Sequence, residues 1–472
     1  MAPKNRRRRA APPSASSEIL NTLKHPDAGG VDVGAEELVA AVPMGRAAQC
    51  VQTFSSFTSG VNALRDWFLE CGIKTVAIES TGNYWITLYA VLEDAGIEVY
   101  LVNARHAKGV PGKKTDVCDA QWLQQLHQAG LLRRSFRPHR QVVPMRYLMR
   151  HRAELICEAS RQVQRMQKVL TEMNLHLHHV FSDLDGQSAQ RIINSILDGE
   201  RDPQKLAKLR DGRCRAPLSR VLQALEGDYR PELLFVLRQC QERREQIVAS
   251  IAACDQEIAR LCAEVSSNEE PAPPESPQPP QTCTGTQKRE SKRSAGKHKN
   301  DLGFAVQQEA LRFYGVDLCS IDGIGTSTLA VLMSEVGTRE QMLKAFPSSH
   351  AFSSWLGLCP DTRITGGKVI RSKTRRVKSR LAHALRMAAQ GVRNSRSELG
   401  RLALRLGGRL GKAEGITATA HKLARILYGV IASKRPYDEA TAFRLTPAKK
   451  QRQIRMLLRK AQAMGMQLVP AV

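Results

Sequence analysis

The sequence lacks several features that would assign it to a common class of protein. No apolar run reaches the roughly 20 residues that a membrane-spanning helix needs. The first residues, Met1 to Arg9, lack the apolar segment of a secretory leader. No Gly-x-x-x-x-Gly-Lys-Ser/Thr sequence occurs, so nothing indicates ATP-driven chemistry. We therefore expect neither a membrane protein nor a P-loop ATPase.

Paired cysteines are also missing. The 11 cysteines are scattered singly from Cys50 to Cys359, without a Cys-x-x-Cys pair. This spacing predicts neither a zinc site nor a disulfide framework. Reduced thiols in the cytosol are the simplest interpretation.

Acidic residues are too few to balance the basic ones. The 472 residues include 71 Lys and Arg against 45 Asp and Glu, which gives a formal net charge of +26. Such an excess indicates a polyanionic partner, with nucleic acid favoured over an anionic membrane surface. We predict that residues 1–25 form a disordered basic arm, which either contacts phosphates or is a solvated tail.

Residues 26–140 alternate in the manner of an α/β domain. The expected strands are 30–33, 37–42, 47–54, 74–79 and 97–102, and the expected helices are 61–69, 85–95 and a helix beginning at 116. The order of three strands, helix, strand, helix, strand and helix is that of an RNase H-like domain.

Four acidic residues fall at positions that such a domain brings together. Asp32 lies on the first strand, Glu79 ends the fourth, and Asp116 and Asp119 share one face of the last helix. Carboxylate oxygens favour Mg2+ or Mn2+, and a pair of such ions supports phosphodiester cleavage. Taken singly, the same residues have ordinary interpretations: an acidic first turn, a turn aspartate before Gly34, and a solvated strand end.

The middle region, residues 141–265, is predicted to be helical and to contain a coiled coil. Apolar residues recur in alternating steps of four and three, which is a heptad seam. Its members are Leu233, Leu237, Cys240, Arg244, Ile247, Ile251, Cys254, Ile258, Leu261 and Val265. The seam predicts either a hairpin within the chain or a dimer interface, and we favour the dimer. For His176, His178 and His179 we favour a polar helix face or loop over a metal site.

The C-terminal part begins after a Pro-rich and basic linker at residues 266–303. We predict a mostly helical domain at 304–445 and a basic helical tail at 446–472. Gly323 and Gly325 precede a helix, as in a helix-hairpin-helix element that binds phosphate through backbone N–H groups; an ordinary capping turn is the alternative. The basic residues Lys368, Arg371, Lys373, Arg375 and Arg376 are predicted to contact nucleic acid rather than to form only a solvated face.

Two blocks of sequence resemble a known family. The first contains Glu79-Ser80-Thr81-Gly82-Asn83-Tyr84-Trp85 and Lys113-Lys114-Thr115-Asp116-Val117-Cys118-Asp119-Ala120; the second contains Ile321-Asp322-Gly323-Ile324-Gly325, Trp355-Leu356-Gly357-Leu358-Cys359-Pro360 and Gly366-Gly367-Lys368. They resemble the bacterial insertion-sequence transposases of the IS110 type, in particular the IS1111 subgroup.

The resemblance implies a RuvC-like domain whose Asp-Glu-Asp-Asp set is Asp32, Glu79, Asp116 and Asp119, with two Mg2+ or Mn2+ ions. It also implies a serine nucleophile before Gly-Gly-Lys, a covalent protein–DNA linkage and guidance by a structured bridge RNA. The expected partners are element-end and target DNA, that RNA, and further copies of the chain in a dimer to tetramer. Arg105, Lys113 and Lys114 are expected to contact nucleic acid, and the expected location is the bacterial cytoplasm, near the nucleoid.

One residue departs from the family pattern. Thr365 stands before Gly366-Gly367 where the family has serine, and we predict that its hydroxyl is the nucleophile. Ser372 is a less favoured alternative. Two other functions stay open at this point: a metal-dependent nuclease of the Holliday-junction-resolvase kind, and a nucleic-acid-binding protein without activity.

Overall fold

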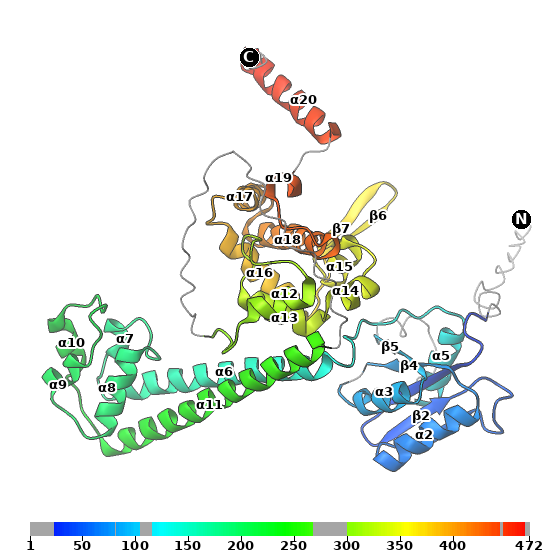
Figure 1. Cartoon of the computed structure of the whole chain (residues 1–472), viewed down its shortest axis with the longest axis horizontal. Helices are drawn as coiled ribbons and strands as arrows, with labels where there is room; N and C mark the ends of the chain where they lie inside the picture. Colours follow the sequence, from blue (N-terminus) through cyan, green and yellow to red (C-terminus); the bar gives the residue numbers. More distant parts are fainter. Residues whose placement is uncertain (1–22, 81, 104–115, 268–299, 444–446, 468–472) are drawn as a thin grey trace, which may run out of the picture. The chain divides into compact units, whose positions relative to one another are not determined.

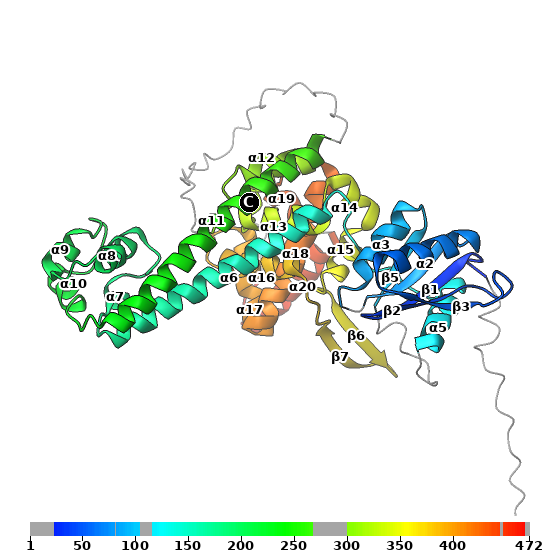
Figure 2. The ribbon, with the colours of Figure 1, turned by 90° about the horizontal axis from the view of Figure 1, so that it is seen from below.

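A computed structural model describes residues 23–80, 82–103, 116–267, 300–443 and 447–467, and Figures 1 and 2 show it from two directions. The chain divides into two compact units, Met1–Arg137 and Pro138–Val472. Most of the predicted arm and linker, and Arg105, Lys113 and Lys114, lie outside the described residues. Within the described residues, no helix has both the length and the apolar character needed to cross a bilayer.

The first unit is built on a mixed five-stranded sheet with the order β3-β2-β1-β4-β5. Its elements are β1 (Ala28–Val33), β2 (Glu37–Ala41), β3 (Val51–Ser55), α2 (Thr58–Glu70), β4 (Thr75–Glu79), α3 (Trp85–Asp94), β5 (Glu98–Val102) and α5 (Asp116–Gln128). β1 to β3 are antiparallel, whereas β4 runs parallel to both β1 and β5. The expected order of elements is confirmed, and the fold is consistent with an RNase H-like domain.

The two faces of this sheet are covered by different helices. Val31 and Ile78 belong to a core with side chains of α2 and α3, whereas Ala77 packs with Leu123 of α5 on the opposite face. β4 lies between two parallel neighbours and has both faces covered, which explains its unbroken apolar run Val76, Ala77 and Ile78.

A long pair of helices dominates the start of the second unit. α6 (Val143–Glu172) and α11 (Pro231–Ser267) lie side by side in Figures 1 and 2. They are antiparallel, because Met145 meets Cys262 at one end while Leu170 shares a core with Leu237 at the other. The short helices α7 (Leu177–Val180), α8 (Gln187–Leu197), α9 (Pro203–Lys208) and α10 (Leu218–Ala224) gather at that second end.

The heptad seam of α11 packs within the chain. Leu237, Cys240, Ile258, Leu261 and Val265 are all buried there. The structure therefore shows the hairpin within the chain at both ends of the seam, and not the dimer interface that the sequence analysis favours. The charged member, Arg244, forms an ion pair with Asp185 in the loop before α8.

The remainder of the second unit is mostly helical, as predicted. Its helices are α12 (Val306–Tyr314), α13 (Thr326–Val336), α14 (Arg339–Ala345), α15 (Ser349–Trp355), α16 (Arg380–Val392), α17 (Glu398–Leu410), α18 (Lys412–Ser433), α19 (Glu439–Ala442) and α20 (Pro447–Ala463). The sequence analysis did not anticipate the antiparallel hairpin of β6 (Pro360–Thr365) and β7 (Lys368–Thr374).

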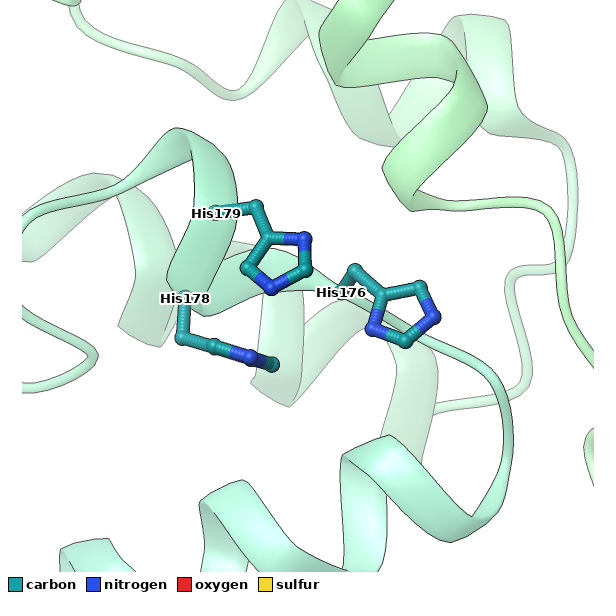
Figure 3. A group of neighbouring side chains, drawn as sticks. All are labelled: His176, His178 and His179. Carbon is teal, nitrogen blue, oxygen red and sulfur yellow. The ribbon is translucent and has the colours of Figure 1, made fainter.

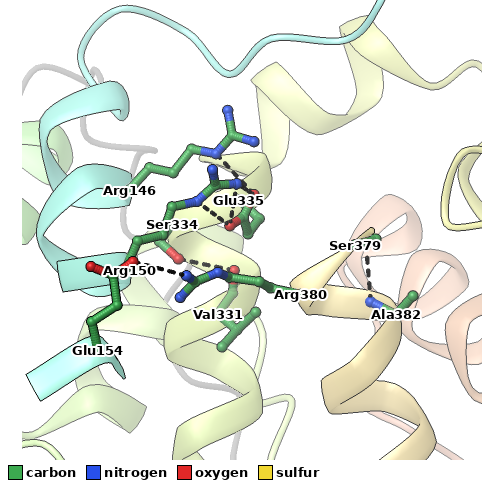
Figure 4. A network of polar contacts seen from close by, with 9 residues as sticks. All are labelled: Arg146, Arg150, Glu154, Val331, Ser334, Glu335, Ser379, Arg380 and Ala382. Atoms are coloured by element: carbon green, nitrogen blue, oxygen red, sulfur yellow. Dashed lines mark hydrogen bonds and ion pairs between the residues drawn. The ribbon is translucent and has the colours of Figure 1, made fainter. Parts of the chain in front are cut away.

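A buried carboxylate joins α6 to α13. Glu335 accepts hydrogen bonds from Arg146, at 2.9 Å, and from Arg150, at 2.9–3.1 Å, as Figure 4 shows. Nearby, Arg380 of α16 lies 3.9 Å from Glu154 of α6. These contacts fix the first half of α6 to α13 and α16.

Candidate functional site

Two of the predicted acidic residues are neighbours on adjacent strands. Val31 of β1 pairs with Ile78 of β4, and Asp32 and Glu79 are the next residues along each strand. Paired strands lie about 4.8 Å apart. Both side chains are half-buried, at the end of the sheet where β1 and β4 finish. The sheet register thus brings these two positions together as predicted.

The third and fourth acids are positioned by the contact between α5 and β1. A Cβ atom on Gly30 would lie only 2.4 Å from the Gln124 nitrogen and 2.6 Å from the Ala120 carbonyl oxygen. Only a glycine therefore allows this helix backbone to approach the strand so closely. The side chain of Gln124 reaches toward the start of β1 and donates a hydrogen bond to the Ala28 carbonyl oxygen at 3.2 Å. α5 therefore runs antiparallel to β1.

This packing places the first residues of α5 beside the last residues of β1. Asp32 lies two residues beyond Gly30, about 6.6 Å along the strand. Asp116 lies four residues before Ala120, about 6 Å along the helix and on the same helix face. Because the two elements are antiparallel, the Asp116 backbone lies at the level of Asp32; its side chain is outside the described residues. Asp119 is half-buried and adjoins Ala120.

A histidine anchors the other end of α5. His127 is buried, its Nε2 lies 2.8 Å from the Thr75 hydroxyl at the start of β4, and its ring stacks on His25 at 4.9 Å. Burial, assisted by His25, lowers the pKa of His127 to about 4. The neutral imidazole therefore holds the helix against the sheet near neutral pH.

A hollow of about 380 Å3 opens beside Asp32. It is lined by Asp32, by the loop between β1 and β2, which includes Glu36, and by Glu37 and Val39 of β2. The sequence analysis did not single out these two glutamates, although their closeness to Asp32 in the chain was a signal. All the acidic groups at this end of the sheet offer carboxylate oxygens, which fit Mg2+ or Mn2+ better than a thiol-preferring metal.

The predicted nucleophile lies at the tip of the β6–β7 hairpin. Thr365 pairs with Lys368 across Gly366 and Gly367, whose φ angles are +56° and +76°. Two positive φ angles define the type I′ turn, which favours glycine at both positions. The Thr365 side chain is exposed, whereas the Ser372 hydroxyl lies 3.3 Å from that of Thr362 within the hairpin.

The predicted nucleic-acid contacts have differing surroundings. Lys368, Arg371 and Lys373 are exposed along β7, and Arg376 is exposed beyond it. Arg375 is exposed as well, and it donates a hydrogen bond to the Ser354 carbonyl oxygen at 2.6 Å.

The two loop glycines also differ. A Cβ atom on Gly323 would lie 2.3 Å from Val392 of α16, so this glycine is needed for packing. Gly325 is the N-cap of α13 and has open space around its Cα. Their role in binding phosphate stays a prediction.

Comparisons with known proteins agree with both blocks of sequence. Residues 29–175 match a family model described as a transposase, of the DEDD type of IS110 elements. Residues 317–402 match a second model, described as the transposase IS116/IS110/IS902 family. A comparison with curated proteins gave no match. The two models do not distinguish the IS1111 subgroup, which stays a prediction.

Proposed function

Because the chain belongs to the transposases of the IS110 type, we propose that it cuts and rejoins DNA strands with a metal-bound carboxylate set and a threonine hydroxyl. As a DEDD transposase, it is a DNA-processing enzyme that depends on divalent metal. Strand exchange through a covalent linkage, the identity and number of the ions, and the residues below are our proposal.

The observation that carries the proposal is the register of α5 on β1. It supports a set made of Asp32 and Glu79 from the sheet and of Asp116 and Asp119 from the helix. When bound there, two Mg2+ ions would neutralise the phosphate and stabilise the developing charges of strand cleavage. The carboxylates hold and orient the ions, and the closely packed helix keeps the two halves of the set at a fixed separation.

Thr365 is the proposed nucleophile of the second unit. Its Oγ1 attacks the phosphorus atom of the scissile phosphodiester, the bond to the leaving oxygen breaks, and the protein becomes linked to one DNA end. The leaving strand takes up a proton and has a free hydroxyl, which can reverse the step on another strand. Exposure at a hairpin tip lets the hydroxyl reach a backbone phosphate.

The exposed basic residues around this tip support binding of the DNA backbone. Lys368, Arg371 and Lys373 would neutralise phosphates on either side of the attacked one. Further copies of the chain and a structured guide RNA complete the proposed assembly, since joining two DNA ends needs more than one protomer.

The test is to incubate the full chain with element-end DNA, element RNA and Mg2+, and to separate protein-linked DNA from free DNA under denaturing conditions. We expect linkage with the parent, loss of linkage with Asp119→Asn, and unchanged linkage with Glu98→Gln. Glu98 begins β5 and is a matched carboxylate control that pairs with the exposed Arg134. Free cut ends without linkage would indicate a nuclease instead, and intact DNA would indicate a binding protein.

A further inference from the structure

Three histidines cluster where α6 ends and α7 begins. The side-chain nitrogens of His176, His178 and His179 that could bind a metal all lie within 4.8 Å of one another, and Figure 3 shows the three rings gathered together. His176 and His179 stack at 5.0 Å with an interplanar angle of 6°, and His178 meets His179 edge-on at 4.2 Å. The three rings therefore lie close enough together for their nitrogens to approach one ion.

The backbone of the cluster is held independently of the rings. Leu175 and Leu177, on either side of His176, are completely buried in the core of the small helices. The His176 N–H donates to the Ala224 carbonyl oxygen at 3.0 Å, and the His179 N–H donates to the His176 carbonyl oxygen at 2.9 Å. The histidines are thus preorganised by packing.

Two of the rings have a buried nitrogen without a hydrogen-bond partner among the described residues. His176 Nε2 lies 2.9 Å from the Asn174 side-chain oxygen, which can only accept, so Nε2 carries the proton and Nδ1 has a lone pair. Within the described residues, His176 Nδ1 and His178 Nδ1 are shielded from water and have no hydrogen-bond partner. A buried polar atom without a hydrogen-bond partner lowers the stability of the folded state. In a metal-bound histidine, the ring nitrogen that does not bind the metal usually donates its N–H to an oxygen atom.

His179 provides a third ligand that can move. It is exposed, so rotation of its side chain can bring the ring inward and close the remaining distance.

We propose that His176, His178 and His179 bind a zinc ion, with water in the fourth position. Three imidazole nitrogens suit Zn2+, whereas Mg2+ prefers oxygen, so this site and the carboxylate set would take different metals. Zinc–nitrogen bonds of about 2.05 Å place tetrahedral ligands about 3.3 Å apart, a modest contraction of the cluster. The bound ion would tie the end of α6 to α7 and strengthen the core of the small helices.

Cobalt provides the test, because Co2+ replaces zinc and absorbs visible light strongly only in tetrahedral sites. The full chain, freed of metal and then saturated with Mg2+, is titrated with Co2+. We expect one equivalent of intensely absorbing Co2+, at least tenfold weaker binding in His178→Gln and His179→Gln, and unchanged binding in His151→Gln. His151 is an exposed histidine of α6 and serves as the matched control.

The same samples give a second readout. Zn2+ is expected to raise the Tm of the parent but not of His179→Gln, which should fold normally because its side chain is exposed. The proposal is overturned if the parent gives no intense Co2+ spectrum, or if folded His179→Gln binds Co2+ as tightly as the parent does.

Discussion

The contact between Gly30 and α5 allows a sharp test of the proposed site. A methyl group added in Gly30→Ala would lie 2.4 Å from the Gln124 nitrogen and 2.6 Å from the Ala120 oxygen. Ordinary contacts are about 3.4 Å or longer, so the helix has to move by about 1 Å. Overpacking of this kind costs about 1–3 kcal/mol of folding free energy. A 1 Å shift between catalytic groups costs about 100-fold in rate.

Gly29→Ala is the matched control on the same strand. Its methyl group would point to the other face and lie 3.2 Å from the Phe68 ring and 3.3 Å from Ile73, a much smaller overlap that a shift of a few tenths of an ångström relieves. We expect a loss of less than about 1 kcal/mol and nearly normal strand cleavage. The assays are chemical denaturation and the initial rate of DNA cleavage as a function of Mg2+ concentration. If Gly30→Ala were as stable and as active as Gly29→Ala, the deduced helix register could not control the site.

Three further predictions concern separate parts of the chain. Thr365→Ser should raise the rate of protein–DNA linkage by about threefold to tenfold, because it removes a methyl group that restricts χ1, and Thr365→Ala should abolish linkage. Glu335→Ala should lower the free energy of unfolding by about 3 kcal/mol, since it leaves two arginines without their buried partner. Tm should fall as the pH drops from 6.5 to about 4, because the unfolded chain protonates His127 before the folded one does.

Each of these predictions has its own control. Equal linkage by Thr365→Ala and the parent would remove this hydroxyl from the reaction. Glu257→Ala breaks an exposed pair with Arg260 and should leave stability unchanged; a loss as large as that of Glu335→Ala would contradict the burial argument. The stability contributed by neutral His127 is complete above pH 6.5. His127→Gln should therefore flatten the dependence of Tm on pH between pH 6.5 and 4. An unaltered dependence would show that other groups cause the fall in Tm.

Much of the first unit was predictable from sequence, because its elements have strong local signals. The apolar run of β4 predicts a buried strand. The spacing of the apolar residues around Leu64 predicts a helix with one buried face. The sequence analysis did not predict the β6–β7 hairpin, although two glycines between β-branched residues, Ile364-Thr365 before them and Val369-Ile370 after Lys368, are a recognised hairpin signal. Lys368 and Lys373 are poor strand formers, which weakens the local strand signal of β7.

The heptad seam shows the limit of such inference. Its period correctly predicted one apolar face on α11, but the same period serves a neighbouring helix or a second chain equally well. Only the return of α6 along that face, with Met145 against Cys262, decided that this chain covers the seam.

The sequence by itself determined the order of strands and helices, the basic surface, and the placing of carboxylates at element ends, because these depend on local periodicity and composition. The tertiary structure decided that Gly30 sets the level of α5 against β1, that Glu335 joins α6 to α13, and that the side-chain nitrogens of three histidines lie within 4.8 Å of one another. Such relations depend on which surfaces meet, and a linear pattern does not specify its partner.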